Sequence, residues 1–194
     1  MPSVKKTVLT AVCMTLCVVL PQAFHMIPNA GTVFLPMHIP VLLCGLICGW
    51  SYGLLCGLTG PVLSFLLTGM PSAAILPAMM VECGLYGAIT GLMMQHIKTK
   101  RLYADLYISL ITAMVLSRVV SGAVKALILT PGKITLAVWV TGSFVTCLPG
   151  IIIHLVLIPT LVCALMRARL IPERYPKGSV LPKFSRTVGP LTAE

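Results

Sequence analysis

The chain has 194 residues, of which 58% are hydrophobic and only 9% are charged, and its mean hydropathy is +1.02. A water-soluble domain usually carries about 25% charged residues, so this composition excludes a soluble fold and predicts an integral membrane protein. The net charge is +10, but lysines and arginines cluster between apolar runs rather than on one polar surface, which argues against a nucleic-acid-binding domain.

Six apolar segments predict an all-α integral membrane protein built as a six-transmembrane-helix bundle. In chain order we expect the spans at residues 6–24, 36–50, 52–68, 76–95, 104–129 and 135–166. A bilayer requires roughly 20 residues per helix. No small-residue cleavage site follows the first span, so it is expected to remain as a helix rather than be removed as a signal peptide. The sixth span is overlong and contains Pro149, Gly150 and Pro159, which predicts a kink or a break.

The distribution of basic residues predicts the orientation. Six spans put both termini on one side of the membrane, and the basic groups at residues 5–6, 96–101 and 167–169 then share that side. The loops on the opposite side hold only His25 and Lys133. Because positive charge favours cytoplasmic loops, both termini are expected in the cytoplasm.

The chain divides into a membrane domain at residues 1–170 and a tail at residues 171–194. The tail is rich in proline and polar residues, so we expect it to be a loosely ordered cytoplasmic segment.

Catalytic chemistry is not indicated. The chain contains four acidic residues, no Gly-x-x-x-x-Gly-Lys-Ser/Thr phosphate loop and no evident nucleophile–base arrangement. We therefore expect neither an enzyme nor a cofactor, and no ATP hydrolysis by phosphate-loop chemistry.

Small residues recur every four positions on the first span, at Thr7, Ala11 and Thr15. This spacing places them on one side of a helix and allows a second helix to approach closely. Two interpretations stay open: packing inside this protein's own bundle, or docking of a separate membrane subunit.

Three charged residues fall inside predicted spans, where charges are costly and mark functional sites by default. Arg118 lies in the middle of the fifth span, and Lys125 follows seven residues later on about the same face, nearer the outside. Glu82 lies in the outer third of the fourth span. These side chains either ring an outward-opening cavity for an anionic ligand, or Arg118 pairs with Glu82 while Lys125 extends to the membrane surface.

Other polar and aromatic residues are candidates to line the same cavity. Asn29 lies in the first outer loop, where its amide could close over a ligand. Tyr86 and Trp139 either wall the pocket or pack in the core. His38, between two prolines, is expected at the outer end of the second span, where it either holds loop backbone or contacts the ligand. His154 either reaches the cavity or hydrogen-bonds a neighbouring helix.

A metal site is not expected. Cys13 and Cys17 are one helical turn apart, as are Cys44 and Cys48, and with His38 they raise the idea of a path for a soft metal. No carboxylate or histidine lies close by in sequence to complete either cysteine pair.

The stretches AFHMIPNAGTVFLPMHIPVLLCGLICGW, YGLLCGLTGPVLSFLLTGMP and LPAMMVECGLYGAITGLM resemble the S component of energy-coupling factor (ECF) vitamin transporters. The resemblance covers about residues 5–169. It implies a multi-pass protein of a prokaryotic-type cell membrane that binds a micronutrient from outside. The resemblance places the ligand cavity between the outer halves of spans four to six, under the first outer loop.

The resemblance also implies partners, namely a transmembrane coupling subunit and two cytoplasmic ATPases. The stripe of Thr7, Ala11 and Thr15 would meet the coupling subunit, although the family often has alanines there. Arg118 and Lys125 favour an anionic ligand, for which pantothenate is one candidate, and the scarcity of aromatic residues argues against large flat rings. The rival interpretation is a self-contained secondary transporter or channel, which the lack of an evident internal repeat disfavours.

Overall fold

The computed structural model of the chain describes residues 2–24, 30–129 and 136–171. These residues form helices and short connections, with no strand among them. The elements are α1 (Ser3–Ala23), α2 (Ala30–Phe34), α3 (His38–Cys48), α4 (Trp50–Thr68), α5 (Leu76–His96), α6 (Leu102–Val124), η1 (Lys125–Leu129), α7 (Leu136–Val140), η2 (Thr141–Val145) and α8 (Leu148–Arg167). The segments η1 and η2 are single turns of π-helix.

The helical class expected from composition is confirmed. Within the described residues, five helical segments are long and apolar enough to cross a membrane. The element found at the expected second span is shorter, because α3 has eleven residues and spans about 17 Å at 1.5 Å per residue. Since the hydrocarbon core is about 30 Å thick, α3 by itself is too short to cross it.

The expected interruption of the last span lies just before Pro149. The chain passes from α7 through the π-turn η2 to a turn at residues 146–147, and α8 begins there with Pro149 in its first turn. A proline is tolerated at that position because its missing N–H would have no helical partner. Pro159 lies inside α8 without ending it, and α4 likewise continues through Pro61.

Helix α5 lies at the centre of the bundle and packs against α3, α4 and α6. Glycines make this packing close: a Cβ at Gly53 would overlap the backbone of Gly87, and a Cβ at Gly87 would overlap the backbone of Gly53. A Cβ at Gly57 would overlap the backbone of Cys83. Without side chains between them, the two backbones contact each other directly, so α4 and α5 form a close-packed base for the rest of the bundle.

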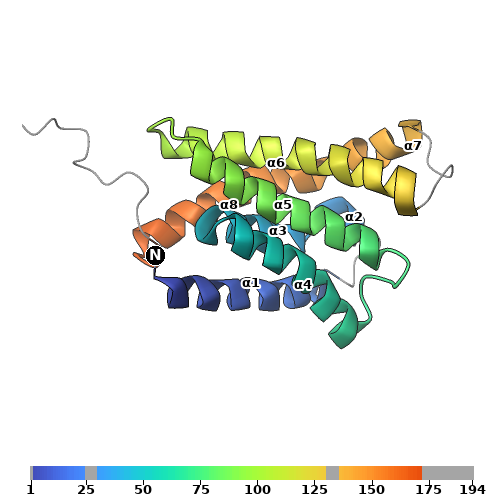
Figure 1. Ribbon diagram of the computed structural model, residues 1–194, viewed down its shortest axis with the longest axis horizontal. Coiled ribbons are helices and arrows are strands. Elements are labelled where there is room, and N and C mark those ends of the chain that lie inside the picture. Colours follow the sequence, from blue (N-terminus) through green and yellow to red (C-terminus); the bar gives the residue numbers. More distant parts are fainter. Residues whose placement is uncertain (1, 25–29, 130–135, 172–194) are drawn as a thin grey trace, which may run out of the picture.

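The two ends of the bundle differ in charge. Figure 1 shows the N-terminus, the α5–α6 connection and the end of α8 at one end of the molecule. This basic end carries Lys5, Lys6, Lys98, Lys100, Arg101, Arg167 and Arg169. The opposite end, which we call the far end, holds the α4–α5 connection, η1 and α7. The clustering of basic residues at one end suits a bundle that crosses a bilayer. So do the many exposed apolar side chains, such as Val4, Leu66 and Val156.

Candidate functional site

Polar side chains from five helical elements meet between the middle of the bundle and its far end. Glu82 and Tyr86 come from α5, Arg118 from α6, and Lys125 from the first position of η1. His38 is the first residue of α3, and His154 lies in the second turn of α8. We call these six residues the polar cluster. Residues that the sequence separates by more than 100 positions are therefore neighbours in one site.

Glu82 is paired with Lys125 and not with Arg118. The Lys125 Nζ donates a hydrogen bond to the Glu82 Oε2 over 2.9 Å, and the other carboxylate oxygen, Oε1, lies 3.7 Å from the His38 Nε2. The alternative in which Arg118 neutralises Glu82 is therefore wrong. The alternative in which Lys125 extends to the membrane surface is also wrong, because its ammonium group binds the partly buried Glu82 carboxylate.

Arg118 is almost fully buried, with 2% of its side chain exposed. Its Nε donates to the Tyr86 hydroxyl over 2.7 Å, and its guanidinium lies 5.7 Å from the ring centre of Phe144. The two terminal nitrogens, Nη1 and Nη2, have no hydrogen-bond partner among the described residues; the Cys147 thiol lies near the guanidinium but without hydrogen-bond geometry to these nitrogens. A buried charge with unsatisfied donors is costly, so this group is suited to receive an anion from outside the described structure.

The two histidines and Tyr86 form a connected group of rings. The His38 ring meets Tyr86 edge-on with centroids 4.9 Å apart, and it stacks on His154 at 6.4 Å. Neither ring nitrogen of His154 has a hydrogen-bond partner among these residues; the Leu35 carbonyl lies near the ring but without hydrogen-bond geometry. The hydrogen bond to a neighbouring helix, one of the two interpretations of His154, is thus not formed.

His38 requires a correction. We expected it at the membrane surface at the outer end of its span, but only 2% of it is exposed. The reason is the shortness of α3, which begins inside the bundle after α2 and the turn at residues 35–37. His38 therefore contacts Glu82 and Tyr86 rather than water, and its Nε2 also lies 4.0 Å from the Cys83 sulfur.

Trp139 and Phe144 connect the last span to this cluster. Their rings meet at 86° with centroids 5.8 Å apart, and the Trp139 indole lies so close to Gly122 that a Cβ there would overlap it. Lys125 and Phe144 both lie in π-turns, which often occur at functional sites. Phe144 was not predicted as a site residue, although it is one of only five phenylalanines. The one indication in the sequence was its position five residues after Trp139.

Asn29, the remaining predicted ligand residue, lies outside the described residues, as do His25, Lys133 and the tail at residues 172–194. The structure therefore brings together Glu82, Tyr86, Arg118, Lys125 and His38, with Trp139 at the margin through Phe144.

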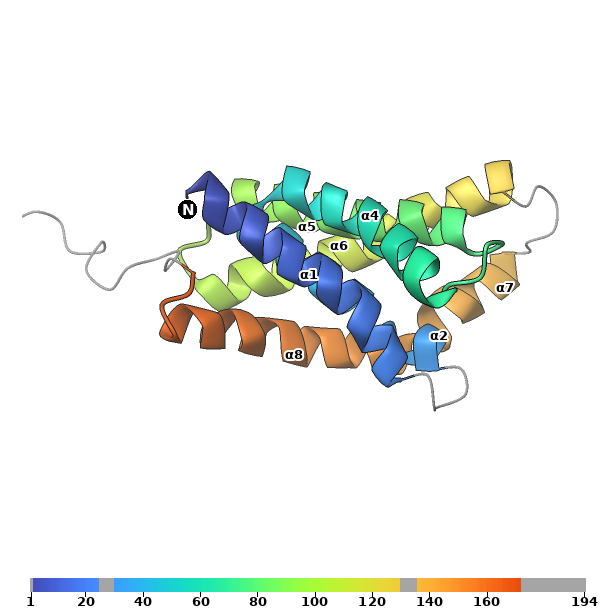
Figure 2. The same ribbon diagram turned by 90° about the horizontal axis from the view of Figure 1, so that it is seen from below.

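The stripe of Thr7, Ala11 and Thr15 faces outward. All three residues are exposed, whereas the buried residues of α1 are Thr10, Cys13 and Cys17. Figure 2 shows α1 crossing the outside of the bundle obliquely. The Thr7 hydroxyl donates to the Ser3 carbonyl and the Thr15 hydroxyl to the Ala11 carbonyl, so neither needs an external partner. The stripe is therefore not used for packing in this chain's own bundle.

Seven of the eight cysteines are buried packing residues, and Cys163 is partly exposed. Cys44 Sγ lies near the Thr10 hydroxyl and the Tyr52 carbonyl, and Cys48 Sγ lies near the Lys6 carbonyl. In the part of the chain that the structure describes, no group of three or more histidine, cysteine or acidic side chains is arranged to hold a metal ion.

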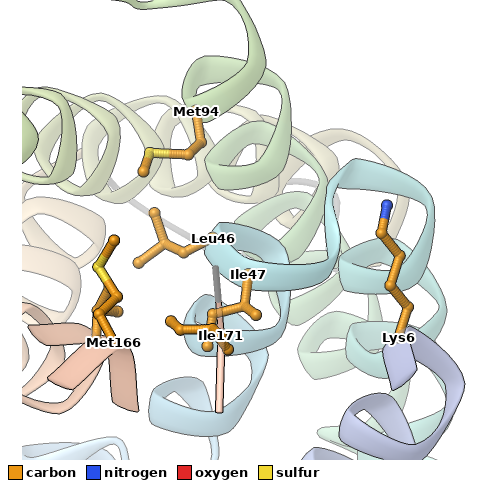
Figure 3. A pocket seen from close by; sticks show the side chains of 7 residues that line it. Lys6, Leu46, Ile47, Met94, Met166 and Ile171 are labelled. Atoms are coloured by element: carbon orange, nitrogen blue, oxygen red, sulfur yellow. The ribbon is translucent and has the colours of Figure 1, made fainter. Parts of the chain in front are cut away.

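A separate cavity of about 190 Å³ opens at the basic end of the bundle (Figure 3). Its lining is apolar apart from one ammonium group and consists of Lys6, Leu46, Ile47, Met94, Val162, Met166 and Ile171. It shares no residue with the polar cluster, so it contributes nothing to the recognition of an anion there.

A family model described as "ECF transporter, substrate-specific component" matches residues 5–162. No curated protein and no solved structure matches the sequence.

Proposed function

Because the chain belongs to the family of ECF transporter substrate-specific components, we propose that it is the high-affinity binding subunit of an ATP-driven importer for an anionic vitamin or related micronutrient. Members of this family are transport subunits of the membrane rather than enzymes, and they associate with an ECF module made of a coupling subunit and ATPases. The present chain would supply recognition and the partners would supply energy.

The negative charge proposed for the ligand rests on the environment of Arg118. Its guanidinium is buried, its Nε is held by the Tyr86 hydroxyl, and its Nη1 and Nη2 have no partner among the described residues. A carboxylate fits such a planar pair of donors with two parallel hydrogen bonds. Pantothenate, which carries one carboxylate, remains one candidate substrate.

The proposed orientation puts the basic end in the cytoplasm of a prokaryotic-type cell and the far end outside. The polar cluster would then face the external side, where the substrate is captured, and Asn29 would belong to the loop above it. The exposed stripe on α1 would meet the coupling subunit, since small residues allow close approach between helices.

Transport assays test this proposal directly. The purified protein is placed in lipid vesicles alone, and in parallel with a coupling subunit and two ATPases, and uptake of radiolabelled pantothenate and other vitamins is measured. We expect uptake only when all subunits are present and ATP is supplied on the side of the membrane that holds the ATPases. Uptake by the protein alone, driven by an ion gradient, would instead establish the secondary transporter and overturn the importer subunit.

A further inference from the structure

The polar cluster contains more information than the sign of the ligand's charge. Resting on the proposed function, we infer that the substrate is a monocarboxylate, a molecule with one negative charge, that also carries a neutral hydroxyl or amide group several bonds away from its carboxylate. The inference follows from the charge balance of the site and from the positions of its unpaired nitrogens.

The charge balance leaves one positive charge for a ligand. Glu82 contributes one negative charge and Lys125 one positive charge, and these two are already paired at 2.9 Å. Arg118 adds a second positive charge, and the group that accepts from its Nε is the Tyr86 hydroxyl rather than a carboxylate. A single carboxylate therefore neutralises the cluster, whereas a second one would find Lys125 already engaged by Glu82. Lys133 lies outside the described residues and is not counted.

The two histidines are not part of this count. The His38 Nε2 lies 3.7 Å from the Glu82 Oε1, so this ring shares the Glu82 carboxylate with Lys125. The His154 ring is buried and stacks on the His38 ring with centroids 6.4 Å apart.

The second polar group is indicated by His154. A neutral imidazole has one donor and one acceptor, and both nitrogens of this buried ring lack a partner in the described structure. From Arg118 the contacts run through Tyr86 and His38 to His154. A molecule whose carboxylate binds Arg118 would therefore present a group some atoms away to His154, and a hydroxyl or amide satisfies either nitrogen without adding charge.

Other classes of micronutrient fit less well. A cation such as thiamine is repelled by the net positive charge, and a neutral ring system such as riboflavin leaves the Arg118 donors unsatisfied. A dicarboxylate such as folate brings a second charge without a second unpaired cation among the described residues.

The test is calorimetry on the full-length protein in lipid nanodiscs. The probes are pantothenate, biotin and nicotinate as monocarboxylates, and folate, riboflavin and thiamine as the other classes. Each monocarboxylate is matched with a neutral analogue: pantothenol, biotinamide or nicotinamide. We expect the tightest probe to be a monocarboxylate, and its neutral analogue to bind at least tenfold more weakly.

Charge variants sharpen the result. Lys125→Gln lowers the net charge of the cluster to zero and is expected to weaken binding of the monocarboxylate. Glu82→Gln raises the net charge to +2 and is expected to reduce the difference in affinity between folate and the monocarboxylate. The double variant has the wild-type net charge, and its affinity for the monocarboxylate should lie between those of the two single variants. This ordering separates an effect of charge from an effect of a damaged fold.

The outcomes distinguish this inference from the proposed function. Tight binding of thiamine, riboflavin or folate, or equal binding of a monocarboxylate and its neutral analogue, would overturn the inference and leave the vitamin-binding subunit intact. Failure of every probe to bind, together with absence of uptake in the reconstituted importer, would overturn the proposed function and the inference with it.

Discussion

The Nε of Arg118 donates to the hydroxyl of Tyr86 over 2.7 Å, and this contact leaves both terminal nitrogens of the guanidinium unpaired. Tyr86 is itself buried between Arg118 and the edge of the His38 ring. The hydroxyl therefore positions the guanidinium, while no carboxylate among the described residues forms an ion pair with it.

Arg118→Ala is expected to weaken binding of the tightest anionic probe at least tenfold, or about 1.4 kcal/mol, because it removes the two terminal nitrogen donors, Nη1 and Nη2. The measurement is calorimetry, with thermal unfolding of the purified variant as the check on folding. Tyr86→Phe is the matched variant: it keeps the charge and the ring and removes only the positioning hydroxyl, so its loss should be smaller. Unchanged affinity of a folded Arg118→Ala protein would remove Arg118 from the site.

Removal of one partner from the Glu82–Lys125 pair should destabilise the fold. Glu82→Ala leaves Lys125 without the carboxylate at 2.9 Å. Because the pair is partly buried, we expect a loss of about 1–3 kcal/mol, between the values for exposed and for buried pairs. Thermal unfolding in detergent measures it. The double change Glu82→Gln with Lys125→Gln removes both charges of the pair together and should unfold at a higher temperature than Glu82→Ala; the opposite ranking would show that the pair is not a source of stability.

The close approach of α4 and α5 predicts a strong effect of Gly87→Val. The added side chain would meet the backbone of Gly53, which cannot move aside as a flexible side chain can, so the helices must separate. Overpacking of this kind typically costs about 1–3 kcal/mol. Gly142→Ala is the control, since a Cβ there has nothing within 4 Å. Equal unfolding temperatures for the two variants would contradict the packing of α4 on α5.

Ala11→Phe is expected to weaken assembly with the coupling subunit, because a large ring prevents close approach to the stripe of Thr7, Ala11 and Thr15. Vitamin binding by the isolated protein should stay unchanged, as α1 contributes nothing to the polar cluster. Val12→Phe is the matched control: Val12 is 50% exposed but lies about 100° round the helix from Ala11. Co-purification with the coupling subunit reports the result, and equal assembly of both variants would place the docking surface elsewhere.

Much of the site could be predicted because buried charges are rare in apolar spans. Glu82, Arg118 and Lys125 were recognisable from the sequence, and so was the relation of Arg118 to Lys125 on one helix. The partner of each charge was not recognisable. Glu82 and Lys125 are 43 positions apart, and their pairing depends on how α5 is rotated against α6, which no local pattern specifies.

His38 and His154 illustrate the same limit. Their neighbours along the chain are apolar in both cases, and a lone histidine near a proline resembles a residue of the membrane surface. Only the early start of α3 inside the bundle brings the two rings to 6.4 Å from each other.

The amino-acid sequence by itself determined that this is a helical membrane protein, the approximate helix bounds, the basic end and the family, because hydropathy, helical period and charge are properties of local segments. The tertiary structure alone decided that Glu82 binds Lys125, that Tyr86 holds Arg118, that His38 is buried, and that Thr7, Ala11 and Thr15 face outward. These depend on the distance and rotation between packed helices, which are set by contacts between residues that are remote in the chain.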